Sequence, residues 1–234
     1  MKRLTTFFVA VVCLGAIHTK LVSQESSILI YHDISGSVMS DNDITDKAHQ
    51  FVKRYLYTKL DSEPTSVVAG FLFANSGSVL NHKSYLYTPT SSEEDTFVQK
   101  ARIIQGVRET LFEKNHSSNQ TEILSSLRHI LKEASKADSI NIIYISDMVE
   151  SSAIRQLQLH SMKDAQEKAM VDVAKLKSMY SLSKNSNTEA RFLCLIPLEK
   201  GLTNENRNFQ YIEEYWKSIL SELFLHFTIQ FQAL

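Results

Sequence analysis

Short apolar runs alternate along the chain with longer segments in which apolar residues recur three and four positions apart. The runs end in polar loops, as buried strands do, and about six are expected, at residues 27–32, 67–73, 79–88, 139–146, 191–196 and 226–231. The periodic segments predict five helices, which begin near Ile44, Ser92, Thr121, Met162 and Phe209. In the second of these the periodic positions are Phe97, Ala101, Ile104, Val107 and Leu111.

The near-alternation of strands and helices predicts an α/β fold: a doubly wound, mostly parallel central sheet with helices on both faces. The run at 139–146 is almost continuously apolar, as a central parallel strand should be. The turn signal at 75–78 predicts that the strand within 79–88 returns antiparallel and forms an edge. No linker or internal repeat divides the chain, so one domain is expected.

The N-terminus has the pattern of a secretory signal peptide. Lys2 and Arg3 precede an apolar run at 4–17, and polar residues follow it. The run is shorter than the roughly 20 residues that span a bilayer, so no membrane span is expected in the mature chain. We predict cleavage near Ser23, which makes residues 1–23 a signal peptide, residues 24–234 the mature domain, and the protein periplasmic or secreted.

The two cysteines do not indicate a disulfide framework. Val12 precedes Cys13, where a lipidated cysteine has a small residue before it, and this argues against a lipid anchor. Cys194 lies in an apolar run and is expected to be a buried thiol. An exported chain without disulfides fits a bacterial export route.

Charge and motif content exclude several classes of function. The 25 basic and 26 acidic residues leave a net charge of −1, whereas a nucleic-acid binder needs a basic excess. The sequence has no Gly-rich phosphate loop, no His-Glu-x-x-His pair and no Gly-x-Ser-x-Gly elbow. His32 is interpreted as a strand-end residue and not as a catalytic base. These observations favour a protein that is not an enzyme.

Oxygen-bearing side chains leave the carboxyl ends of predicted strands, where α/β sheets bind ligands. Asp33-Ile-Ser35-Gly-Ser37 follows the first strand, Asp147 follows the strand at 139–146, and Thr121 opens a helix. Two carboxylates and three hydroxyls are hard ligands that suit Mg²⁺ or Mn²⁺. We infer that uncharged hydroxyl ligands would leave the ion able to accept an acidic group from a partner.

These three segments, in this order, resemble the von Willebrand factor type A domain family and its metal-ion-dependent adhesion site. The resemblance extends over the whole predicted mature chain. It implies that Ser35, Ser37 and Thr121 are hydroxyl ligands and that Asp33 and Asp147 bind the ion directly or through water. It also implies a module that binds a protein partner through bound Mg²⁺. One position departs from the family, because Met148 stands where glycine commonly follows the aspartate.

Alternatives remain open at this point. A metal-dependent phosphatase or hydrolase would use Asp33 as its nucleophile, although Ser35 stands where such enzymes have a second aspartate. A domain of the same fold whose metal site does not work is also compatible with Met148. Thr121 could simply cap a helix. Glu150 is expected to be a solvated loop carboxylate.

Overall fold

A single mixed sheet forms the centre of the computed structural model, which describes residues 26–34, 42–61, 63–72, 82–112, 120–152, 155–197 and 206–234. Its order is β3-β2-β1-β4-β5-β6. The strands are β1 (Ser26–His32), β2 (Thr65–Phe71), β3 (His82–Tyr87), β4 (Ser139–Ile145), β5 (Asn185–Ile196) and β6 (Phe224–Ala233). Neighbouring strands are parallel except for β3, which pairs antiparallel with β2 at one edge. The predicted antiparallel edge strand is confirmed.

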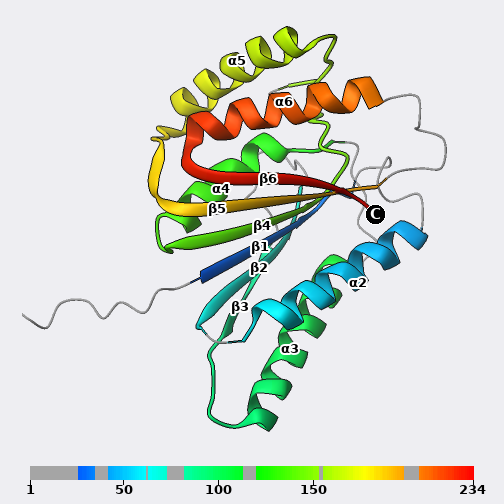
Figure 1. The fold of residues 1–234 in the computed structure, drawn as a ribbon, viewed down its shortest axis with the longest axis vertical. Coiled ribbons are helices and arrows are strands. Elements are labelled where there is room, and N and C mark those ends of the chain that lie inside the picture. The colour runs from blue at the N-terminus through cyan, green and yellow to red at the C-terminus, as the bar shows by residue number, and fades with distance from the viewer. Residues whose placement is uncertain are drawn as a thin grey trace, which may run out of the picture.

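Helices cover both faces of this sheet. Among the described residues they are α2 (Asn42–Lys59), α3 (Glu93–Leu111), α4 (Ile123–Ala134), α5 (Met162–Tyr180) and α6 (Asn206–Leu223). Figure 1 shows α4, α5 and α6 on one face and α2 and α3 on the other. Each face has its own apolar core. The fold is therefore the doubly wound α/β fold that the alternating pattern predicts.

The extent to which each strand is buried explains the pattern of apolar and polar residues along it. β1 is buried along its whole length, and β4 is buried after its first residue, because helices cover both of their faces. β5 and β6 are longer than the predicted runs at 191–196 and 226–231. The additional residues of β5 are mostly polar, whereas those of β6 include the buried Phe224, and the residues of both strands alternate between more and less buried positions. The apolar runs therefore locate these two strands but not their full length.

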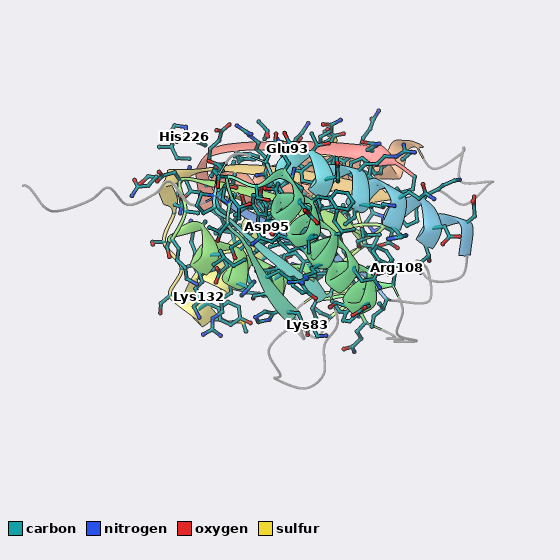
Figure 2. The ribbon with its side chains drawn as sticks, turned by 90° about the horizontal axis from the view of Figure 1, so that it is seen from below. Lys83, Glu93, Asp95, Arg108, Lys132 and His226 are labelled. Carbon is teal, nitrogen blue, oxygen red and sulfur yellow. The ribbon has the colours of Figure 1, made fainter. Side chains whose placement is uncertain are left out.

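Helix α3 packs closely against the edge strand. A Cβ atom at Gly106 would lie 2.5 Å from Cε1 of Tyr85, so only glycine fits there without a shift of the tyrosine ring. The Tyr85 hydroxyl also forms a hydrogen bond of 2.9 Å with the hydroxyl of Thr110. Acidic residues lie in the first turn of α3 and Arg108 in its last, which suits the helix dipole (Figure 2).

The remaining expectations for the fold have mixed outcomes. Cys194 is buried in the core beneath α4, α5 and α6, as expected. The helix predicted near Ile44 begins two residues earlier, at Asn42, and Asp43 in its first turn pairs with Lys47. Within the described ranges, none of the helices has both the length and the apolarity to cross a membrane. The predicted signal peptide, with Cys13, lies outside the described residues.

Candidate metal centre

The candidate site lies where the strand order reverses between β1 and β4. From β1 the chain passes to β2 on one side of it, and it returns later to β4 on the other side. β1 and β4 are in register up to His32 and Ile145, and the Asp33 amide donates a hydrogen bond of 2.9 Å to the Ile145 carbonyl. The residues after both strands therefore emerge side by side. In open α/β sheets this reversal is the usual place for a ligand.

The Asp33 carboxylate is the centre of the site. It is fully buried, and the hydroxyl of Thr121 lies 3.1 Å from each of its two oxygens. The hydroxyl of Ser146 donates to Oδ2 of Asp33 over 3.0 Å. Thr121 and Ser146 are 88 and 113 positions away from Asp33 in sequence. The fold thus brings three distant oxygen-bearing side chains to one point.

Of the other predicted ligands, the structure describes Asp147 but not Ser35 or Ser37. Asp147 directly follows Ser146, is partly buried, and accepts a hydrogen bond of 2.9 Å from the Val149 amide through Oδ1. Ser35 and Ser37 lie outside the described residues, together with Gly36. The structure therefore brings Asp33 and Thr121 into direct contact and places Asp147 next to Ser146, which itself contacts Asp33.

Ser146 was not among the predicted ligands. Its hydroxyl donates to Asp33 and also accepts a hydrogen bond of 3.0 Å from the Met148 amide. It therefore holds the carboxylate and the loop after β4 in one arrangement. The signal for it was available in the sequence, since pairing the apolar runs of β1 and β4 end to end places Ser146 opposite Asp33.

The prediction that Thr121 opens a helix is wrong, and so is the alternative that it caps one. Helix α4 begins at Ile123, and Glu122 occupies the cap position without a side-chain capping hydrogen bond. Thr121 instead forms an isolated antiparallel bridge with Ser151, with backbone hydrogen bonds of 3.1 and 3.3 Å. This bridge leaves the Thr121 hydroxyl directed at Asp33.

The expectation of a solvated Glu150 is wrong. Its side chain is fully buried, and Oε2 accepts a hydrogen bond of 2.9 Å from the Leu124 amide in the first turn of α4. Among the described residues no hydrogen-bond partner is found for Oε1. Burial raises the pKa of Glu150 to about 7, against smaller opposing effects of the Ser152 hydroxyl and the backbone amides of Leu124 and Ile123.

Met148 takes a backbone conformation for which glycine is the usual residue. Its φ is 61°, in the left-handed region, while its side chain is buried in the core beneath α4, α5 and α6. Its carbonyl accepts a hydrogen bond of 2.8 Å from Nε1 of Trp216 in α6. The loop after Asp147 thus turns through this residue and is fixed to the last helix.

His32 has a structural environment. It is buried, and Nδ1 donates a hydrogen bond of 3.0 Å to the Leu111 carbonyl at the end of α3. Burial lowers its pKa to about 4, so the ring is neutral near pH 7. These contacts agree with its interpretation as a strand-end residue.

The donor chemistry of the site fits a hard divalent cation. Asp33, Asp147, Thr121 and Ser146 offer carboxylate and hydroxyl oxygens, which Mg²⁺ and Mn²⁺ prefer. Within the described part of the chain, no group of three or more His, Cys, Asp or Glu residues could hold a metal ion. A site rich in hydroxyls would not form such a group, so the donor set remains compatible with the expected ion.

The fold and the site together define a doubly wound α/β protein with an oxygen-lined site at the reversal of its strand order. No family model and no curated protein matches the sequence. Solved structures similar to this chain include the human COPII-coat protein Sec24c, with 11% identity and a TM-score of 0.45 over 93% of this chain and 30% of that one. The pilus adhesin SpaC of Lactobacillus rhamnosus GG, in an open conformation, has 11% identity and a TM-score of 0.46 over 89% and 28%. The chain spans less than a third of either protein.

Proposed function

We propose that this protein is an exported binding module of the von Willebrand factor type A kind, which holds Mg²⁺ or Mn²⁺ and captures an acidic group of a partner protein. The observation that carries the proposal is the convergence of the Thr121 and Ser146 hydroxyls on the buried carboxylate of Asp33. Residues from all three segments thus meet at Asp33: Thr121 from one, and Ser146, which Asp147 follows, from another.

In this proposal Asp33, Ser35, Ser37, Thr121 and Asp147 hold the ion, directly or through water. Ser146 orients Asp33 and is a supporting residue. The bound ion would supply positive charge that attracts a carboxylate of the partner. Hydroxyl ligands suit this task because they do not neutralise the charge of the ion.

The departure at Met148 does not argue against the site. Glycine is common at this point in the family, and Met148 has the positive φ that glycine adopts readily. Its buried side chain and its carbonyl contact with Trp216 hold the turn in place. The turn after Asp147 is therefore held in one conformation despite the larger side chain.

The alternative of a phosphatase with Asp33 as nucleophile has less support. Such enzymes place a second aspartate two residues after the nucleophile as a general acid, and this chain has Ser35 at that position. A generic phosphate ester, incubated with the protein and Mg²⁺, should therefore show no turnover.

Calorimetric titration with Mg²⁺ and with Mn²⁺ tests the proposal. We expect saturable binding at one site, abolished by Asp33→Asn and weakened by Thr121→Val. Ser146→Ala should weaken binding about 10–100-fold, as loss of a supporting residue typically does. Thr65→Val is the matched control, because Thr65 is also buried but lies at the opposite end of the parallel strands.

A second titration uses a short peptide with one aspartate, in the presence of the metal. Binding of this peptide should disappear with a chelator and with the corresponding asparagine peptide. If neither metal binds at millimolar concentration, with or without the acidic peptide, the proposal is wrong. N-terminal sequencing of the exported protein would check the cut predicted near Ser23.

A further inference from the structure

The segment between β4 and α5 crosses the beginning of α4 and contacts it at several points. Ser151 forms the backbone bridge with Thr121, and the Ser151 hydroxyl accepts a hydrogen bond of 3.1 Å from the Thr121 amide. One residue earlier, the Glu150 carboxylate accepts from the Leu124 amide over 2.9 Å. The Glu150 carbonyl accepts from the Leu157 amide, which closes the segment on itself.

Helix α4 lacks a capping side chain of its own. Glu122 at the cap position makes no side-chain capping hydrogen bond, and the first turn of α4 contains no acidic residue. The first amides of a helix need acceptors, and a negative charge near them is stabilising. Glu150, from another part of the chain, supplies an acceptor to the first turn.

Capping a helix with a buried carboxylate lowers the stability of the folded protein. Glu150 is fully buried, and its Oε1 has no hydrogen-bond partner within the described segments. A buried carboxylate with an unsatisfied oxygen lowers stability, and an ordinary serine or aspartate at residue 122 would cap the helix from the surface. The placement of Glu150 therefore points to a local geometric task.

Thr121 stands directly between the two contacts. Its backbone is bound to Ser151 on one side, and Leu124, three residues later, is bound to Glu150. Between these anchors its hydroxyl reaches Asp33 over 3.1 Å. Movement of the first turn of α4 would therefore displace this hydroxyl.

We propose that Glu150 is a positioning residue that fixes the start of α4 and thereby sets the affinity of the site for Mg²⁺ through Thr121. This inference rests on the proposed function. Glu150 does not touch the ion, and its action depends on accepting the Leu124 hydrogen bond. Its charge is not required for that action.

The test compares two substitutions that separate acceptance of a hydrogen bond from side-chain volume. Glu150→Met keeps the volume and removes the acceptor, and Glu150→Gln keeps an amide oxygen that accepts from Leu124. We expect Glu150→Met to weaken Mg²⁺ binding about tenfold or more and Glu150→Gln to restore most of the affinity. Metal-free hydrogen exchange at the Leu124 amide should quicken in Glu150→Met alone.

Thermal unfolding separates positioning from a merely structural role. The midpoint of Glu150→Met should be unchanged or raised, because removal of a buried charge offsets the lost hydrogen bond. Glu122→Gln is the control for a nearby carboxylate and should leave Mg²⁺ affinity unchanged. Wild-type affinity in Glu150→Met, or affinity lost equally in Glu150→Gln, would overturn this inference alone. Absence of Mg²⁺ binding by the unaltered protein would overturn the proposed function as well.

Discussion

Two fully buried carboxylates, Asp172 and Glu150, have opposite surroundings. Asp172 in α5 accepts hydrogen bonds of 2.8 and 2.7 Å from Nε and Nη2 of Arg155, and its Oδ2 accepts another of 2.8 Å from the Tyr215 hydroxyl. Glu150 accepts from the Leu124 amide through one oxygen, and its other oxygen has no partner among the residues described. The comparison teaches that burial alone does not tell what a carboxylate does. The charge of Asp172 is balanced by Arg155, and its hydrogen bonds join α5 to Arg155 and to α6. One oxygen of Glu150, beside the candidate site, accepts no hydrogen bond from the residues described.

Both carboxylates restrain the same segment. Arg155 binds it to α5 through Asp172, and Glu150 binds it to α4 through Leu124. The segment after β4 is therefore held from two sides, and the candidate site lies at its beginning. Changes at Asp172 should alter stability, whereas changes at Glu150 should alter local geometry and pH response.

The largest expected effect comes from breaking the compensated pair. Arg155→Ala would leave the Asp172 charge buried without its cationic partner, and we expect a loss of about 3–5 kcal/mol in the free energy of unfolding. Urea unfolding measures it. Arg191→Ala is the matched control, since Arg191 makes an equally bidentate pair with Glu189 on the surface. That substitution should change stability by less than about 1 kcal/mol.

The uncompensated carboxylate should appear in the pH dependence of stability. The pKa of Glu150 is raised from 4.5 to about 7, so its stabilising contribution is present below about pH 4.5 and is lost as the pH rises through 7. The stability of Glu150→Gln relative to the unaltered protein should therefore rise by about 3 kcal/mol across this window. Urea unfolding at a series of pH values measures the difference.

His32 provides the opposing control for this pH experiment. Its pKa is lowered from 6.5 to about 4, so its contribution is present above about pH 6.5 and is lost as the pH falls through 4. His32→Gln should therefore lose stability relative to the unaltered protein as the pH rises through this window. If both variants follow the pH profile of the unaltered protein, the assigned burial of both groups is wrong.

A smaller effect separates the two partners of Asp172. Tyr215→Phe removes one hydrogen bond to the carboxylate and leaves the Arg155 pair intact, so we expect a loss of about 2 kcal/mol. Tyr144→Phe, which removes a hydrogen bond of 2.6 Å between neutral hydroxyls of Tyr144 and Ser126, should cost about 1 kcal/mol. Equal losses in the two variants would show that the charge of Asp172 adds nothing.

Most of the fold was predictable because apolar periodicity records which faces are covered. β1 and β4 are built around short apolar runs, and the turn signal before β3 marked the antiparallel edge. The buried face of α3 was not predicted correctly. Phe97 is 60% exposed, whereas Lys100 is 7% exposed and pairs with Asp61 at 3.1 Å. Pairing with a distant aspartate is a tertiary effect that helical spacing does not encode.

Some features of the candidate site could be predicted from the sequence, and others could not. Asp33 and Thr121 could be placed together because strand ends converge at one edge of a parallel sheet. The burial of Glu150 could not, because it depends on the path of an irregular segment without periodicity. Its contact with Leu124 lies 26 positions away in the chain. Ser35 and Ser37 remain predictions.

Trp216 gives this molecule an optical reporter for its site. It is the chain's single tryptophan, it is 1% exposed, and its indole N–H is bonded to the carbonyl of Met148. Tryptophan fluorescence therefore comes from one position. This position is hydrogen-bonded to Met148, the residue that follows Asp147. Ligand binding that shifts this loop would alter the emission of Trp216 while the protein remains folded, so occupancy could be followed in real time without an attached dye.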